Sequence, residues 1–154
     1  MFASAVLGPL QARTDSQRAI DAATIAYLSD IGGVEERGFN LRGEALAIAR
    51  VQGRAGRVSS SWFSYDMPVD RSNAVAVVVT YNTALAWFCR FAVSVDGERV
   101  AEEYMPPRER AEFFDVHYGV PSGVATAKDR ITVRFDALGG DNIAPVFAVR
   151  TIRA

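Results

Sequence analysis

Apolar and polar residues alternate in several stretches of this chain. Between residues 61 and 69, every second side chain is apolar, namely Phe63, Tyr65, Met67 and Val69. The same two-residue period returns at residues 114–120 and 131–135. This period is typical of β-strands that bury one face. Because this period is repeated several times, the sequence favours an antiparallel β-sandwich over an α/β sheet.

Apolar stretches separated by turn residues predict a series of short strands. They fall at residues 24–28, 62–69, 74–81, 87–95, 99–104, 113–120, 130–137 and 145–153. Residues 74–81 are almost continuously apolar, which is typical of a central strand with both faces covered. Asp96-Gly97 is a hairpin signal. Residues 44–51 fit a helix or a strand, and we assign them as extended. Loops are expected at 29–43, 52–60, 105–110, 122–129 and 138–144.

The start of the chain has a different character. Residues from Pro9 to Ala23 are rich in Ala, Gln and Arg, which favours a helix that Thr14 or Asp15 could cap. We therefore expect a lead-in helix over residues 1–23 and a sandwich domain over residues 24–154. The predicted fold class is all-β, an antiparallel β-sandwich of the jelly-roll, galactose-binding-domain-like kind with a short N-terminal helix.

Composition excludes several classes of function. The chain has 154 residues and a net charge of −1, so it lacks the excess of positive charge that nucleic-acid binding requires. Its apolar runs are shorter than the roughly 20 residues of a membrane helix. Residues 1–10 lack the basic start of a signal peptide, so we expect a cytoplasmic location.

Residues that could perform catalysis are few. Cys89 is the single cysteine and stands in the apolar run 86–91, which favours a buried structural role. His117 is the single histidine and should point away from the core, because Val116 and Tyr118 flank it in an alternating strand. One histidine and one cysteine do not make a metal site. No spacing selects a catalytic pair among the carboxylates Glu35, Glu36, Glu44, Glu102, Glu103, Glu112 and Asp115. We expect no catalytic residue, metal or cofactor in this chain by itself.

From Ala12 to the end, the chain resembles the C-terminal β-sandwich domain of bacterial β-L-arabinofuranosidase-type glycosidases (glycoside hydrolase family 127 and its relatives). The matching segments are 40–44, 62–67, 95–97, 113–116 with Tyr118 and Pro121, 131–135 and 146–151. The chain departs from the pattern at Arg37, where relatives tend to carry histidine, and at Ile143-Ala144-Pro145, which replaces a more Gly-rich turn.

The resemblance implies an accessory role. The resemblance implies that the chemistry belongs to a separate helical barrel with a zinc-bound cysteine nucleophile and a glutamate acid/base. This sequence contains neither that barrel nor its cysteine cluster. The expected function is that of a non-catalytic domain that supports a glycosidase catalytic domain or its oligomer. The alternative is a stand-alone carbohydrate-binding module with an exposed aromatic platform.

Exposed aromatic side chains would support the carbohydrate-binding alternative, because flat rings stack on sugar faces while polar neighbours supply hydrogen bonds. The candidate carbohydrate-binding residues are Trp87, Trp62, Tyr81, Asn82 and Tyr104. Sandwich cores also use buried Trp and Tyr. Trp87 follows the break at Asn82-Thr83 and is therefore the candidate that we most expect to be exposed.

Overall fold

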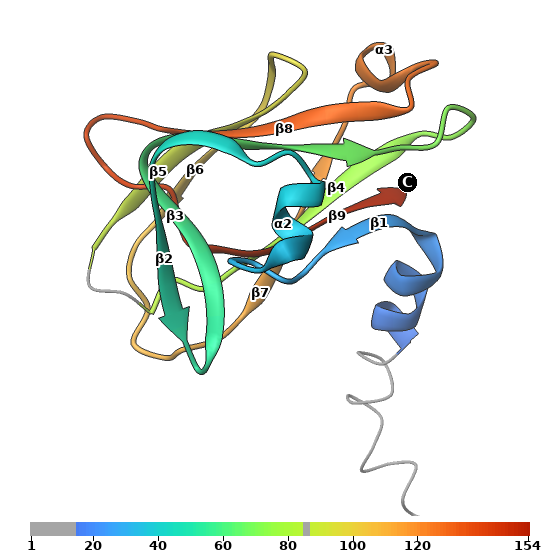
Figure 1. The fold of residues 1–154 in the computed structure, drawn as a ribbon. Helices are drawn as coiled ribbons and strands as arrows, with labels where there is room; N and C mark the ends of the chain where they lie inside the picture. Colours follow the sequence, from blue (N-terminus) through green and yellow to red (C-terminus); the bar gives the residue numbers. More distant parts are fainter. Residues whose placement is uncertain (1–14, 85–86) are drawn as a thin grey trace, which may run out of the picture.

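The computed structural model describes residues 15–84 and 87–154 (Figure 1). Residues 15–23 are helical. The other elements are β1 (Thr24–Leu28), α2 (Val34–Gly38), β2 (Arg42–Val51), β3 (Arg54–Pro68), β4 (Val75–Tyr81), β5 (Cys89–Val95), β6 (Glu98–Met105), β7 (Phe114–Gly119), α3 (Ser122–Ala125), β8 (Arg130–Ala137) and β9 (Val146–Arg153). Residues 1–14 of the predicted lead-in helix, with its Thr14 cap, and Ala86 of the predicted apolar run lie outside the described residues.

The strands form two layers that face each other across the core (Figure 1). One layer has the order β6-β5-β8-β3, with β2 paired to the other edge of β3. The second layer has β7, β4 and β9 in that order, with β1 paired to β9. Strand β3 joins the layers, since Arg57 is in register with Val146 of β9. The pairs between named strands are antiparallel, so the predicted antiparallel β-sandwich is confirmed.

The alternating residues fill the space between the layers as predicted. Phe63, Tyr65 and Met67 of β3 are fully buried in the main core. They face the other layer together with side chains of β5 and β8. The ring of Phe63 stacks on Phe135 of β8, with centroids 4.9 Å apart. Burial of such large rings is the main stabilising contribution in a domain of this size.

Strand β4 is central, as its apolar run predicted. It pairs with β9 on one edge and with β7 on the other. Its odd-numbered residues enter the main core, whereas Ala76 and Val78 face outward. Ile20 and Ala23 of the N-terminal helix pack against this outer pair and Ile152. The helix therefore covers an apolar strip that would otherwise be exposed to water.

Three predicted loops contain regular structure. Segment 29–43 includes α2 and the first residues of β2, segment 122–129 includes α3, and most of segment 52–60 belongs to β3. The β2–β3 turn is confined to Gln52-Gly53, which adopt left-handed φ values of 51° and 77°. A Cβ on Gly56 would lie 2.7 Å from the ring of Phe147. The glycine that suggested a loop is thus required for close packing of a strand.

A buried carboxylate connects α2 to the sandwich. Glu36 is 2% exposed and accepts hydrogen bonds from Arg57 Nε (3.0 Å) and Nη2 (2.5 Å). It also accepts from the Tyr65 hydroxyl (2.5 Å) and the Gly32 backbone N–H (3.0 Å). Arg57 Nη1 donates to the Ala47 carbonyl at 3.1 Å, so the same network reaches β2.

The network keeps Glu36 ionised. Burial by itself would raise the pKa of the Glu36 carboxyl, but hydrogen bonds from Arg57, Tyr65 and Gly32 outweigh that effect and hold the pKa below its ordinary value of 4.5. Burial and the Glu36 charge together raise the pKa of Tyr65 far above its ordinary value. At neutral pH Tyr65 therefore keeps its proton and donates it to Glu36.

Replacing Glu36 should destabilise the domain strongly. Glu36→Ala would leave the Arg57 guanidinium buried without its partner, and losing one member of a buried pair costs about 3–5 kcal/mol. Urea unfolding followed by tryptophan fluorescence measures the change. Glu112→Ala removes the same side chain at an exposed site and is the matched control. Equal unfolding free energies for the two variants would contradict a central role for this network.

Stability should also fall in acid through the same group. Because the pKa of Glu36 is lower in the folded state, its contribution is fully present above its ordinary pKa of 4.5. The contribution is lost as the pH falls from there through the folded-state pKa. Unfolding free energies measured from pH 7 to pH 3 should show a steeper acid-side decline for the native sequence than for Glu36→Gln. Parallel curves would contradict this assignment.

Candidate functional site

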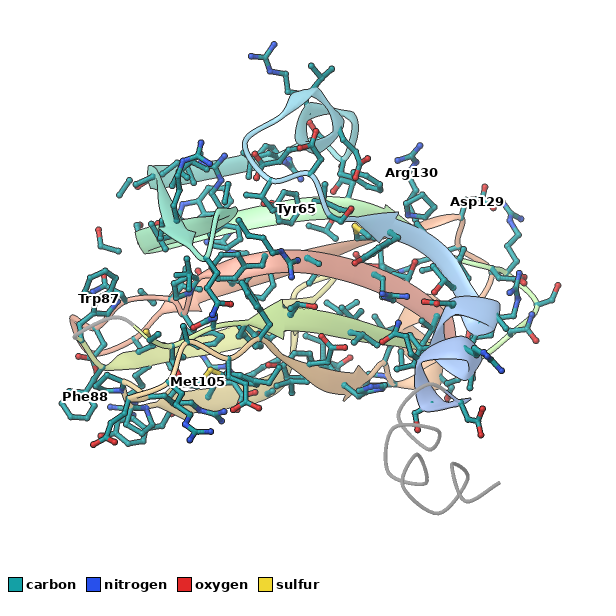
Figure 2. The ribbon with its side chains drawn as sticks, turned by 90° about the horizontal axis from the view of Figure 1, so that it is seen from below. Tyr65, Trp87, Phe88, Met105, Asp129 and Arg130 are labelled. Atoms are coloured by element: carbon teal, nitrogen blue, oxygen red, sulfur yellow. The ribbon has the colours of Figure 1, made fainter. Side chains whose placement is uncertain are left out.

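Trp87 lies at one end of the sandwich, two residues before the start of β5. Its side chain is 39% exposed, as predicted, but it is not the most exposed candidate, because Tyr104 is 63% exposed. Figure 2 shows Trp87 and Phe88 together at this end, far from Asp129 and Arg130 at the other end. The position is fixed by backbone pairing, because Cys89 forms a bridge with Asn142 and the Arg90 N–H donates to the Asn142 carbonyl at 3.1 Å.

A shallow recess of about 280 Å³ opens beside Trp87. It is lined by side chains of the β2–β3 hairpin and by the loop before β9: Ala45, Ala47, Val58, Ser59, Ser60 and Asn142. Small residues make the floor flat, and the exposed Ser60 and half-buried Asn142 supply polar groups. The Ser59 hydroxyl donates to the Glu44 carbonyl at 2.6 Å, which anchors the hairpin where its register shifts.

Two further aromatic side chains are exposed near Trp87. Phe88 is the next residue in the chain, and Tyr104 lies on the neighbouring strand β6. Phe88 is 51% exposed and Tyr104 is 63% exposed, and their rings stack with centroids 6.0 Å apart and planes at 9°. Tyr104 reaches this place because it is opposite Arg90 in the β5–β6 register. Phe88 was missed by the sequence prediction, because it stands in an apolar run that reads as core.

Tyr81 and Asn82 are corrections to the predicted site, because both side chains are fully buried. Tyr81 falls on the inner face of β4 with Val77 and Val79. Its hydroxyl is 2.8 Å from the Tyr118 hydroxyl, which donates to Glu103 at 2.5 Å. Burial, followed by the effect of Tyr118, raises the pKa of Tyr81 well above its ordinary value. Neither residue presents a surface to a ligand.

Trp62 is half-buried on the outer face of β3, and one side of its indole ring is covered. The Arg134 guanidinium carbon lies 4.0 Å from the ring centroid, and Asp136 pairs with Arg134 at 3.0 Å. A cation held over the ring in this way competes with a ligand for the same ring face. Trp62 is therefore a poorer platform than Trp87.

The remaining candidates for chemistry are dispersed. His117 is exposed on the outer face of β7, opposite Val78. Cys89 is buried as predicted, and burial raises the pKa of its thiol to about 11, which disfavours the reactive thiolate. Within residues 15–84 and 87–154, no three His, Cys, Asp or Glu side chains gather as metal ligands. In the same residues no helix has the length and apolar character needed to cross a bilayer.

The fold is shared with solved carbohydrate-binding domains. A family 35 carbohydrate binding module from Clostridium thermocellum superposes with a TM-score of 0.57 at 14% identity, covering 84% of this chain and 99% of that one. The CBM36-1 domain of a multidomain xylanase, from the hindgut metagenome of Trinervitermes trinervoides, gives 0.54 at 10% identity, covering 77% and 94%.

An enzyme also contains this fold as one part of a longer chain. The exo-beta-1,3-galactanase from Phanerochaete chrysosporium gives a TM-score of 0.57 at 10% identity, covering 82% of this chain and 29% of the enzyme. Because the identities are only 10–14%, these similarities establish the β-sandwich fold and not the ligand or activity.

Sequence comparison gives the family. No protein with a curated description matches this sequence. Residues 36–152 match the family described as "Family of unknown function (DUF6805)". This range begins at the buried Glu36 and ends in β9, so it covers most of the sandwich. The chain therefore belongs to the family of unknown function DUF6805.

Proposed function

We propose that this protein is a non-catalytic β-sandwich domain that binds carbohydrate for a larger carbohydrate-active enzyme. The observation that carries the proposal is the exposed Trp87 beside a flat recess with Ser60 and Asn142 at its side. The similarity in fold to carbohydrate binding modules supports it. Function must rest on the site, because one fold hosts many activities.

The chemistry of the recess suits a sugar ring. A pyranose or furanose has an apolar face of C–H groups that stacks on an indole, and hydroxyl groups around its edge that need hydrogen bonds. The alanines of the floor let the ring approach closely, while Ser60 and Asn142 offer donors and acceptors. The recess of about 280 Å³ lies just below the roughly 300–1,000 Å³ of drug-sized pockets, so it suits one sugar unit or a chain end.

The same recess suits binding better than hydrolysis. Glycosidases act through a pair of carboxyl groups that flank the scissile bond. The described residues that line the Trp87 recess carry no ionisable side chain. General acid–base catalysis needs a titratable group within hydrogen-bond reach of the substrate. These features support a module that holds a glycan near an active site on another domain. The sequence resemblance leads us to propose that this enzyme is of the β-L-arabinofuranosidase type.

Trp87→Ala should abolish most of the sugar binding. Calorimetric titration of the purified domain with arabinose- and galactose-containing oligosaccharides should show saturable binding that weakens roughly tenfold or more in this variant, equivalent to about 1.4 kcal/mol. Trp62→Ala is the matched control, because Arg134 already covers that ring. Absence of binding by the native domain, or an equal loss in both variants, would contradict the proposed site.

Support of a catalytic domain is a second candidate function, favoured by exposed apolar side chains on α2 and β2. Val34 is 82% exposed, and Leu46 and Ile48 are partly exposed on β2. Ile48 Cδ1 would lie 3.3 Å from a Cβ on Gly32, so the segment leading into α2 adjoins β2. Among the described strands, β2 pairs only with β3, so its other edge has no strand partner within residues 15–84 and 87–154.

Ile48→Glu should weaken such docking without affecting sugar binding. The domain would be co-expressed with the catalytic barrel of a β-L-arabinofuranosidase-type glycosidase, and co-purification would be compared for the native sequence and the variant. A charge placed in an apolar contact should reduce recovery of the complex, because the charge would be desolvated there. Glu98→Gln, an exposed change on β6, is the control. Recovery of equal amounts with Ile48→Glu would contradict this docking surface.

A further inference from the structure

A second recess lies on the outer face of the layer that contains β9 and β4. Its volume is about 360 Å³, within the roughly 300–1,000 Å³ of small-molecule sites. Its polar side chains come from elements far apart in the sequence: Gln17, Arg54, Thr80, Asp115 and Arg150. The rings of Tyr27 and Phe113 complete the walls. Aromatic walls with converging hydrogen-bonding groups are the usual features of a small polar ligand site.

Arg54 is the unneutralised cation of this recess. Its guanidinium carbon lies 4.4 Å from the centroid of Phe113 and 5.8 Å from that of Phe147. Among the described residues, no carboxylate is within ion-pair distance of Arg54. By contrast, Arg57 on the same strand β3 pairs with Glu36, and Arg150 on β9 pairs with Asp21. Stacking on Phe113 fixes the plane of the guanidinium. No side chain or backbone group in the described part of the chain accepts a hydrogen bond from it, so its N–H donors suit a fork-shaped contact with a ligand.

Arg150 has a different role in the same recess. Its Nη1 donates to Asp21 at 2.9 Å and to the Thr24 hydroxyl at 3.1 Å. Its guanidinium carbon lies 4.0 Å from the centroid of Tyr27, and its side chain is 10% exposed. Arg150 is therefore already neutralised, and it holds Tyr27 as a wall of the recess.

Asp115 restricts the kind of ligand that the recess accepts. The Thr80 hydroxyl donates to the Asp115 carboxylate at 2.6 Å, and the side chain of Asp115 is otherwise exposed. A compact anion in the recess would be repelled by this carboxylate. A ligand with a carboxylate on one side and hydroxyl donors on the other would satisfy Arg54 and Asp115 together.

Arg54 also borders a neighbouring recess of about 380 Å³, which is lined in part by Ser29, Asp30 and Arg50. The cation thus stands where two polar recesses adjoin. An extended ligand could continue from one recess to the next past Arg54. This arrangement favours one unit of a glycan chain over an isolated small acid.

We propose that the recess at Arg54 binds a sugar acid, with the sugar carboxylate on the Arg54 guanidinium and sugar hydroxyls on Asp115 and Gln17. The site goes beyond the Trp87 recess and is separate from it. At about 3.4 Å per residue, the Cα atoms of Arg54 and Ser59 are about 17 Å apart along β3. The Trp87 recess binds through stacking and uncharged groups, whereas the Arg54 recess selects a negative charge.

Amide chemical-shift titration of the ¹⁵N-labelled domain tests this proposal. The probes are sodium D-glucuronate and sodium D-galacturonate, compared with D-glucose, D-galactose and sodium acetate. We expect saturable shifts around residues 27, 54 and 113–115, with a sugar acid bound roughly tenfold more tightly than its neutral counterpart, because a hydrogen bond between charged groups contributes that much. Raising the salt concentration should weaken the binding.

Two variants locate the charge. Arg54→Gln should weaken binding of the sugar acid roughly tenfold. Arg130→Gln removes the same charge at the exposed first residue of β8, which pairs with Pro68 at the far end of β3, and should change affinity less than about twofold. Trp87→Ala should leave binding of the sugar acid unchanged, which separates this proposal from the one for the Trp87 recess.

Several results would overturn the proposal. They are absence of binding, equal binding of neutral sugars or of acetate, and unchanged affinity in Arg54→Gln. Loss of sugar-acid binding in Trp87→Ala would place the ligand in the other recess. If Arg54→Gln proves unfolded from its amide spectrum, the location of the shifts in the native domain and the comparison with neutral sugars and acetate decide the question.

Discussion

The buried ion pair of Glu36 and Arg57 is the constraint on which both candidate sites depend. Charged groups taken out of water must find partners within the fold, and this carboxylate is satisfied by Arg57, Tyr65 and the Gly32 backbone. Arg57 lies on β3 between Arg54 and Ser59, and it also donates to Ala47. The network therefore fixes the β2–β3 hairpin, which carries the floor of the Trp87 recess and the free cation of the second recess.

The two recesses differ in the kind of ligand that their chemistry favours. The Trp87 recess has an apolar floor and uncharged polar groups, so binding there depends on ring stacking and shape. The Arg54 recess is polar, and its lining includes both the stacked guanidinium of Arg54 and the carboxylate of Asp115. The structural superposition on carbohydrate binding modules, with TM-scores of 0.54 and 0.57, establishes the shared fold, whereas the ligands must be inferred from these side chains.

The N-terminal helix belongs to the sandwich energetically. Ile20 and Ala23 cover the apolar strip of Ala76, Val78 and Ile152, so removing the helix would expose that strip. The helix also brings Gln17 to the rim of the second recess and Asp21 to Arg150. The division into a lead-in at 1–23 and a domain at 24–154 remains a prediction, but residues on both sides of it form one recess.

The sequence by itself determined much of the core in β3 and β4, although it wrongly placed the buried Tyr81 and Asn82 in a surface site. The alternation of Phe63, Tyr65 and Met67 and the apolar run of β4 encode burial locally, because neighbouring side chains on a strand point to opposite faces. The same alternation places Tyr81 inside with Val77 and Val79. The exposure of Trp87 also followed from a local break in the pattern. Only the tertiary structure decided the rest: Gly56 belongs to a strand because Phe147 packs against it, Glu36 is buried because Arg57 meets it, and Tyr104 joins Phe88 across β5 and β6. These contacts join residues distant in the chain, and no local pattern records them.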